Sequence, residues 1–390
     1  MHILMIAPEP IFEPRGTPLS VVGRLKAFSD MGHEVDLVTY PIGETVQLPN
    51  ITFHRTRSVP GIQKVKIGPS MAKIPLDFVL VLKSISQLRK KKYDLIHTHE
   101  EAGLWGTALS RWFGVPHIYD MHSSLPQQLK NFDFTSSRLI KRLFDSLENW
   151  ILKNASAVIT ICPDLEAHVA RLFPDRGSIL IENVLDYANV FGETDQSKAI
   201  RERYNLNGNS VALYAGTFES YQGLDLLIRS AKHVLEKQSV RFLMVGGHSD
   251  QVSLYQKQVD DAGLSSSFIF TGQVKPQEIP SYMRCSDILL SPRISGTNTP
   301  LKIYSYLRSG LPIVATRMLT HTQVLNDDVA ELTGTSPEAF AQGILRVLKD
   351  KKSSKKMTKN AKKLADEKYS YAVYKEKLVG CVKLAVERGV

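Results

Sequence analysis

Cysteine is scarce in this chain. The 390 residues include three, Cys162, Cys285 and Cys381. They are far apart, odd in number and without the CxxC or CxxH spacing of a zinc site. A disulfide framework, which small secreted domains commonly use, is therefore not expected. We expect three buried thiols.

Long apolar runs are also missing. The best candidate, residues 78–82, is interrupted by Lys83, whereas about 20 apolar residues are needed to span a bilayer. The first residues, MHILMIAP, enter a strand-like apolar run without the basic region and cleavage site of a signal peptide. We expect no transmembrane helix, and a protein synthesised and retained in the cytoplasm.

Acidic residues are outnumbered, since 39 Asp and Glu stand against 49 Lys and Arg. Residues 55–92 hold ten basic residues, one acidic residue, Asp77, and several interspersed apolar residues. That mixture suits an anionic membrane surface, and we predict peripheral association with the inner face of the plasma membrane. A solvated helix face is the alternative. No recognised nucleic-acid-binding module accompanies the charge, so nucleic acid is not an expected partner.

The chain is long enough for two domains of roughly 190 residues, and its hydrophobic content of 43% is that of a soluble globular protein. In each half, short apolar runs alternate with helical patterns. Strands are expected near residues 3–7, 34–40, 95–98 and 117–119, and again near 211–215, 241–245, 288–290 and 313–315. The pattern predicts an α/β fold with two Rossmann-like, doubly wound domains facing each other across a cleft, at 1–190 and 191–370. The polar stretch 192–209 is the expected linker.

Residues 291–316, SPRISGTNTPLKIYSYLRSGLPIVAT, run from an apolar strand through a small polar loop and a helix into a second strand. Backbone amides of the loop from Gly296 to Thr299 can approach an anion, and Pro300 suits the first turn of a helix. This arrangement predicts a ligand site at strand ends, with a phosphorylated ligand.

The same order of elements resembles the donor-binding segment of family 4 glycosyltransferases, in which a polar loop, a helix and a G-x-P-V-V-A-like strand bind a nucleotide sugar. Here the strand begins with GLPIVAT. Two glutamates usually lie eight residues apart in this segment of the family. This chain has Thr297 and Ser305 there instead, whereas Lys302 fits a family variant with a P-L-K helix start.

The resemblance extends to the first domain. The loop PEPIFEPRGTP at 8–18 is similar to the family's N-terminal glycine loop, with Gly16 and Thr17 near the reacting sugar and Arg15 near an acceptor phosphate. His122, at a strand end, matches a family histidine close to the donor sugar and acceptor. The segment 97–101, HTHEE, resembles the family's H-x-H segment. Structural alternatives are a tight turn for Gly16 and a core or capping role for His122.

In the second domain, GTFESYQG at 216–223 has Thr217 and Gln222 where family members commonly carry Arg and Lys. Because a departing diphosphate needs positive charge or oriented amides, Arg293 and Lys302 are the replacement candidates, with surface salt bridges as the alternative. Gly246, Gly272 and Val274 match family positions near the nucleotide; ordinary strand-to-helix turns are the alternative there.

Together these matches imply a retaining glycosyltransferase that transfers a sugar from a nucleoside diphosphate sugar to a hydroxyl of a glycan or lipid-linked, cell-envelope acceptor. No cofactor and no metal are expected, and the C-terminal helix at 371–390 should cross back to the first domain. The catalytic candidates are His122, Arg293 and Lys302. The donor-binding candidates are Gly16, Thr17, Thr217, Gln222, Gly246, Gly272, Val274, Gly296, Thr297, Asn298, Thr299, Pro300, Leu301 and Ser305. The acceptor-binding candidates are Arg15, His99, Glu100 and Glu101. A nucleotide-sugar epimerase and a non-catalytic nucleotide-sugar-binding scaffold are the alternatives, the latter because of the departures at Thr217, Gln222, Thr297 and Ser305.

Overall fold

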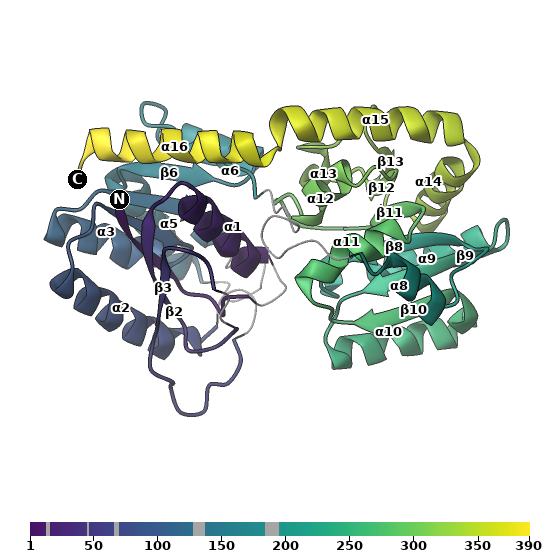
Figure 1. The fold of residues 1–390 in the computed structure, drawn as a ribbon, viewed down its shortest axis with the longest axis horizontal. Helices are drawn as coiled ribbons and strands as arrows, with labels where there is room; N and C mark the ends of the chain where they lie inside the picture. Colours follow the sequence, from purple (N-terminus) through teal and green to yellow (C-terminus); the bar gives the residue numbers. More distant parts are fainter. Residues whose placement is uncertain (13–15, 45–46, 66–69, 128–136, 184–194) are drawn as a thin grey trace. The chain divides into compact units, whose positions relative to one another are not determined.

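In the computed structural model the chain forms two α/β units (Figure 1). The structure describes residues 1–12, 16–44, 47–65, 70–127, 137–183 and 195–390. Unit 1 comprises Met1–Asn183 and Tyr371–Val390, and unit 2 comprises Val184–Ser370. Each unit contains a parallel sheet with helices on it, as the alternating sequence pattern predicts.

Unit 1 is built on a seven-stranded sheet in the order β3-β2-β1-β4-β5-β6-β7, and all its strand pairs are parallel. The strands are β1 His2–Ala7, β2 Glu34–Thr39, β3 Ile51–Arg55, β4 Leu95–His99, β5 His117–Met121, β6 Ala157–Thr160 and β7 Ile179–Leu180. The helices are α1 Gly16–Asp30, α2 Lys73–Lys90, α3 Ala102–Phe113, α5 Arg138–Asn154, α6 Pro163–Leu172 and α16 Tyr371–Arg388. Helix α3 contacts both α2 and α5, and α16 packs on β5, β6 and β7.

Unit 2 is built on a six-stranded parallel sheet in the order β10-β9-β8-β11-β12-β13. The strands are β8 Ser210–Ala215, β9 Val240–Val245, β10 Phe268–Gly272, β11 Ile288–Ser291, β12 Ile313–Thr316 and β13 Glu331–Thr333. The helices are α8 Ser197–Arg203, α9 Leu224–Leu235, α10 Ser249–Asp261, α11 Ile279–Arg284, α12 Lys302–Arg308, α13 Leu319–Thr322, α14 Pro337–Lys349 and α15 Lys351–Lys368, with 3₁₀ turns at Ser220–Gln222, Ser265–Ser267 and Pro276–Glu278.

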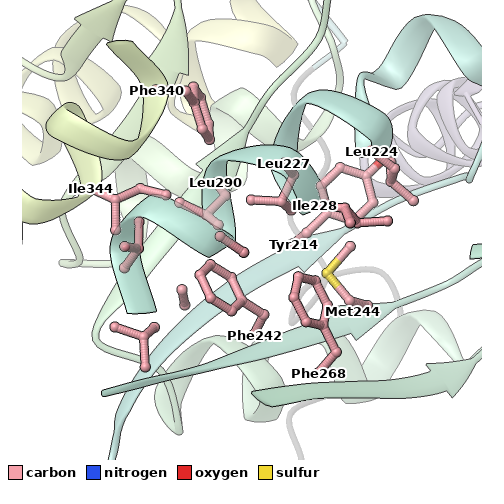
Figure 2. Close-up of a cluster of buried hydrophobic side chains, with 14 of the residues drawn as sticks. Tyr214, Leu224, Leu227, Ile228, Phe242, Met244, Phe268, Leu290, Phe340 and Ile344 are labelled. Carbon is pink, nitrogen blue, oxygen red and sulfur yellow. The ribbon is translucent and has the colours of Figure 1, made fainter. Parts of the chain in front are cut away.

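The core of unit 2 lies between the sheet and the pair α9 and α14 (Figure 2). Aromatic side chains of neighbouring strands fill its centre, and Phe242 stacks on Phe268 with ring centroids 4.8 Å apart. Phe340 and Ile344 of α14 and Leu227 of α9 close over them. Because parallel strands with covered faces are buried on both sides, near-continuous apolar runs such as those of β8 and β9 are what this layer requires.

Several local expectations can be compared with the structure. All three cysteines are buried and free. The predicted linker at 192–209 is not wholly a linker, because residues 197–203 form α8 and Leu206 is fully buried. Strand β13 has only three residues, too few for its apolar pattern to predict it from the sequence. Among the described helices, none combines the length and apolarity needed to cross a membrane.

Candidate functional sites at the strand ends of each unit

In unit 2 the strands β9 and β10 are added on one side of β8, and β11, β12 and β13 on the other. The strand order therefore reverses between β8 and β11. In doubly wound sheets, ligands bind beyond the carboxyl ends of the strands at such a reversal. The segments that follow these two strands, 216–223 and 292–301, carry most of the predicted donor-binding residues. The topology therefore brings together two motifs that are about 80 residues apart in the sequence.

Lys302, the first residue of α12, places its ammonium between these two segments. The Nζ atom lies 3.8 Å from the centre of the Tyr214 ring, and a Cβ on Gly216 would be 3.2 Å from it. It is buried and has no hydrogen-bond partner among the described residues. Burial, together with the nearby charge of Arg293, lowers the Lys302 pKa well below its ordinary value. A buried cation without a counter-ion is costly unless a ligand supplies the negative charge.

Arg293, the other predicted cation, is engaged with its own loop. Its Nε donates to the Ser295 carbonyl at 2.8 Å and its Nη1 to the Asn298 carbonyl at 3.3 Å. Its guanidinium lies over the Tyr221 ring, 4.9 Å from the centroid. Gly296 has φ 104°, and a Cβ there would come within 2.5 Å of the Arg293 Nη2. Arg293 therefore shapes the loop and adds positive potential beside Lys302.

Two predicted residues contact each other after β8. Gln222 donates from Nε2 to the Thr217 hydroxyl at 3.4 Å, and its buried Oε1 has no partner among the described residues. Thr299 Oγ1 is likewise buried and unpartnered among them. Thr217 and Gln222 stand where the family pattern has Arg and Lys, so they offer hydrogen bonds but no compensation for a diphosphate's charge.

The predicted glycine at 246 is required by close backbone approach. Gly246 N donates to the Gly272 carbonyl at 2.9 Å, and Gly246 has φ 121°. A Cβ there would lie 1.9 Å from the Gly216 carbonyl oxygen. Three strand-end glycines therefore meet at this edge of the sheet, which lets a ligand approach backbone atoms closely.

The remaining predicted residues of unit 2 have less distinctive surroundings. The Thr297 carbonyl accepts a hydrogen bond from Gln323 Nε2 at 2.6 Å, and Pro300 is buried. The half-buried members are Val274, Thr297, Asn298, Leu301 and Ser305.

His321 was not predicted from the sequence, although it lies in this site. It is fully buried, its Nε2 is 2.8 Å from the Ser291 hydroxyl and its Nδ1 is 2.8 Å from the Thr316 carbonyl. The two contacts join the ends of β11 and β12. Burial lowers the His321 pKa to about 4. The usable signal was its position five residues beyond the strand 313–316, but a lone histidine is weak evidence.

At the strand ends of unit 1, three side chains of β4 and β5 and that of His122, directly after β5, meet one from α1. Asp120 accepts from Arg24 Nε at 2.7 Å, and its Oδ2 lies 3.3 Å from His97 Nε2. His122 Nε2 is 3.0 Å from His99 Nδ1 and 3.4 Å from Asp120 Oδ1. His122, predicted to lie close to the donor sugar and acceptor, is only 2% exposed and is held within this group. We call these five residues the histidine centre.

The charges within the histidine centre are matched. Burial alone would raise the Asp120 pKa, but the charge of Arg24 and contacts from the histidines outweigh it and hold that pKa well below its ordinary value. Burial lowers the His122 pKa to about 4, against the opposing pull of Asp120. The centre thus contains one ion pair and neutral histidines near pH 7. His97, His99 and Asp120 could offer a metal three atoms within 4.8 Å of one another, but the Arg24 guanidinium already occupies the side of Asp120 where a cation would be attracted.

A second group in unit 1 collects carboxylates around a lysine. Lys73 Nζ lies 2.6 Å from Glu101 and 4.0 Å from Glu9, so this member of the basic segment 55–92 faces inward. Glu100, with φ 50°, accepts from the hydroxyls of Thr17 and Ser123, both at 3.2 Å. Burial and neighbouring carboxylates raise the Glu100 pKa to about 8. Sequence reasoning identified Glu100 and Glu101 but missed Glu9 and Lys73, which only the fold brings to them.

Gly16 is exposed at the start of α1, and Thr17 follows it. Arg15 lies outside the described residues.

A cavity of about 320 Å³ lies in unit 1 beyond the loop that follows His122. It is lined by Ser124, Pro126, Gln127, Lys141, Asp164, His168 and Arg171. His168 Nε2 lies 2.7 Å from Glu148, and this contact raises its pKa. Three basic side chains against one carboxylate give the cavity a positive lining that sequence spacing did not indicate.

Comparison with known proteins is consistent across the chain. The model described as "Glycosyl transferase 4-like domain" matches residues 19–182, and "Glycosyl transferases group 1" matches residues 196–364. An uncharacterized glycosyltransferase of Methanocaldococcus jannaschii is 22% identical over 99% of both chains. The alpha-monoglucosyldiacylglycerol synthase of Acholeplasma laidlawii is 21% identical over 92% of this chain and 91% of its own. The structure of Anabaena HepE in complex with UDP-glucose superposes with a TM-score of 0.76 at 18% identity, covering 98% of this chain and 99% of the other.

Proposed function

The chain belongs to the group 1, family 4 glycosyltransferases and has their GT-B fold, and from that premise we propose that it is a retaining transferase using a nucleoside diphosphate sugar. The sugar passes to a hydroxyl of a lipid-linked, cell-envelope glycan acceptor. The anomeric configuration of the donor is kept in the product. The reaction uses no metal and no resident cofactor.

The observation that carries this proposal is the unpartnered ammonium of Lys302 in unit 2. A diphosphate brought beside Gly216 would supply the negative charge that this buried cation lacks among the described residues. Lys302 then stabilises the charge that develops on the diphosphate as the bond to the sugar breaks, with Arg293 adding positive potential. Gly216, Gly246 and Gly296 have no side chains, so the same ligand can come close to the backbone there.

In unit 1 the histidine centre places His122 at the end of β5, where it orients the sugar and acceptor by hydrogen bonding. Glu100 and Glu101 lie at the end of the adjacent strand β4 and contribute acceptors for hydroxyls. The cavity lined by Lys141, His168 and Arg171 offers positive charge for a phosphate of the acceptor. Those features support a polyhydroxylated acceptor that carries phosphate.

The membrane part of the proposal rests on exposed apolar side chains of two helices of unit 1, α2 and α5. On α2 and just before it, Met71, Ile74, Phe78 and Leu82 are 51–69% exposed. On α5, Leu139 and Leu143 are 78% and 54% exposed, among Arg138, Lys141 and Arg142. An apolar and basic helix face inserts at the headgroup level of anionic lipid. We infer that the enzyme works in the cytoplasm, at the inner face of the plasma membrane.

Transfer is tested by incubating the protein with UDP, GDP, ADP and TDP sugars and lipid-phosphate acceptors, followed by NMR of the newly formed anomeric centre. The expected product keeps the donor's configuration, and Lys302→Met is expected to lower turnover on the order of 10²-fold. Lys257→Met, an exposed lysine of the same unit, is the matched control and should leave turnover unchanged. An inverted product would contradict the mechanism, and equal turnover in Lys302→Met would contradict the role of the lysine.

Membrane docking is tested separately by cosedimentation with vesicles of anionic or zwitterionic lipid. Phe78→Ser with Leu82→Ser should reduce binding to anionic vesicles about 10-fold or more, because each side chain contributes roughly 1 kcal/mol on insertion. Leu254→Ser, which changes a 55% exposed leucine of unit 2, should not. Equal binding by all three proteins would remove the membrane surface from the proposal.

The relatives reported above do not favour an epimerase or a non-catalytic scaffold, since the two named by activity are transferases or synthases. Donor binding without turnover across the acceptor panel would return the scaffold to consideration.

A further inference from the structure

The C-terminal helix α16 joins two parts of the chain that are distant in sequence. Its first residue, Tyr371, directly follows the last residue of unit 2, yet α16 belongs to unit 1. Three side chains along its first two turns fasten it there. Tyr371 donates to Asp30 at 2.7 Å, the Tyr374 ring lies against Arg24 with the guanidinium carbon 4.8 Å from the centroid, and Lys377 lies 2.7 Å from Glu182.

Tyr374 covers the one cation of the histidine centre. Arg24 and Tyr374 are buried, at 0% and 3% exposure, so water does not compensate the guanidinium. Arg24 donates hydrogen bonds to the Asp120 carboxylate at 2.7 Å and to the Ile181 carbonyl at 3.3 Å. The face of the Tyr374 ring attracts the desolvated guanidinium of Arg24 and fixes the plane of that group. Replacing the ring would leave Arg24 free to tilt away from Asp120.

Asp120 in turn determines which ring nitrogen of His122 carries the proton. Its Oδ1 lies 3.4 Å from His122 Nε2, and its Oδ2 is taken by Arg24 and His97. A carboxylate attracts N–H and repels a nitrogen lone pair. The arrangement therefore favours the His122 tautomer with its proton on Nε2, which donates to His99 Nδ1 at 3.0 Å and faces the negative charge of Asp120. In that tautomer the proton acceptor is Nδ1.

We propose that Asp120 and Tyr374 are positioning residues for His122: Tyr374 holds Arg24 in place, Arg24 keeps Asp120 oriented, and Asp120 fixes His122 as the Nε2–H tautomer. A residue of the last helix thereby sets the protonation of a side chain that directly follows β5. The proposal about His122 as a participant rests on the proposed function, whereas the tautomer is a property of the ligand-free protein.

The direct test is long-range ¹H–¹⁵N NMR of ¹⁵N-histidine protein at pH 7.5, with the His122 signals assigned by loss in His122→Gln. The wild type should show His122 with its proton on Nε2, and Tyr374→Leu should show a mixture of tautomers. Tyr374→Phe keeps the ring and should retain the wild-type pattern. Tyr371→Phe is the matched control. It removes the hydrogen bond from Tyr371 to Asp30 but leaves the contact between Tyr374 and Arg24 in place. A His122 with its proton on Nδ1 in the wild type would overturn the proposal.

Turnover supplies the second readout. Tyr374→Leu should lower kcat about 10-fold and Asp120→Asn by 10²-fold or more, with the KM for the donor little changed because the diphosphate contacts proposed for the donor lie in unit 2. Tyr374→Phe should restore kcat. Asp120→Asn leaves Arg24 without its carboxylate, so the Tyr374 variants carry the test if that protein does not fold. Equal losses in Tyr374→Leu and Tyr374→Phe, or a lower kcat with an unchanged tautomer, would contradict the proposal. If no donor and acceptor turn over in the wild type, the proposed function fails, while the NMR result still decides the tautomer.

Discussion

In unit 1 the guanidinium of Arg24 lies 2.7 Å from the Asp120 carboxylate, whereas in unit 2 the ammonium of Lys302 has no hydrogen-bond partner among the described residues. Both cations are buried at strand ends of parallel sheets. The first is compensated within the fold and acts to orient neighbouring histidines. The second is left uncompensated, an arrangement that an anionic ligand would complete. The comparison shows how two similar Rossmann-like units can serve different roles, since one holds a preformed polar network and the other keeps charge for a ligand.

The largest expected effect is the loss of stability of unit 1 when Arg24 is replaced. Arg24→Met leaves Asp120 buried without its partner, and we expect unit 1 to lose about 3–5 kcal/mol of its free energy of unfolding. All three tryptophans, at 105, 112 and 150, lie in unit 1, so tryptophan fluorescence during urea unfolding follows that unit alone. Asp120→Asn paired with Arg24→Met should recover part of the loss; an unchanged midpoint in Arg24→Met would show that the ion pair is not structurally important.

Lys302→Met should have the opposite effect on unit 2. Without ligand, loss of a buried amino group that has no hydrogen-bond partner among the described residues should leave the thermal stability of unit 2 unchanged or raise it. Affinity for a nucleoside diphosphate should fall about 10–10²-fold, as expected for a lost charged hydrogen bond. Calorimetry and thermal shift on the same samples check both parts. A destabilised ligand-free protein would mean that Lys302 is compensated within the fold.

Glu100 tests whether every buried charge of unit 1 is compensated. Its pKa is raised to about 8 by burial and by neighbouring carboxylates, so the folded state binds its proton more tightly than the unfolded state. Stability should therefore fall as pH rises from about 4.5 to 8. Glu100→Gln should remove that loss and make unit 1 more stable than wild type by about 1 kcal/mol or more at pH 9, with little difference at pH 4.5. Urea unfolding midpoints of wild type and Glu100→Gln, read by tryptophan fluorescence at pH 4.5 and at pH 9, test this prediction.

His321 gives a pH effect of the opposite sign, in unit 2. Its pKa of about 4 lies below the ordinary 6.5 because of burial, so the unfolded state binds the proton more readily. Stability should fall as pH drops from 6.5 toward 4, by at most about 1.4 kcal/mol per pH unit for this one group. His321→Asn should flatten that dependence in unit 2, measured by hydrogen exchange of β11 and β12 amides. If the stability of His321→Asn depended on pH as strongly as that of wild type, a group other than His321 would be responsible.

The sequence predicted the α/β class, the two domains and the strands that carry the sites, because apolar runs bounded by Gly and Pro are local signals. It also indicated which loops follow those strands, and the family resemblance singled out Lys302, His122 and Glu100 within them. It could not show that Arg24 pairs with Asp120, 96 residues away, or that Lys73 turns inward to Glu9 and Glu101. Such pairings depend on which strands become neighbours, and no local pattern records that order. The same limit explains why Arg293 was predicted as a phosphate ligand without its contacts to the loop carbonyls.

The most direct test of the uncompensated lysine is calorimetric titration of the protein with UDP, GDP, ADP and TDP at pH 8 in two buffers of different ionisation enthalpy. Because burial lowers the Lys302 pKa and a bound diphosphate should raise it, binding should take up a proton. The account predicts a binding enthalpy that differs between the buffers for the preferred nucleotide, and the loss of this difference in Lys302→Met. The same buffer dependence in wild type and Lys302→Met, or binding of none of the four nucleotides, would contradict it.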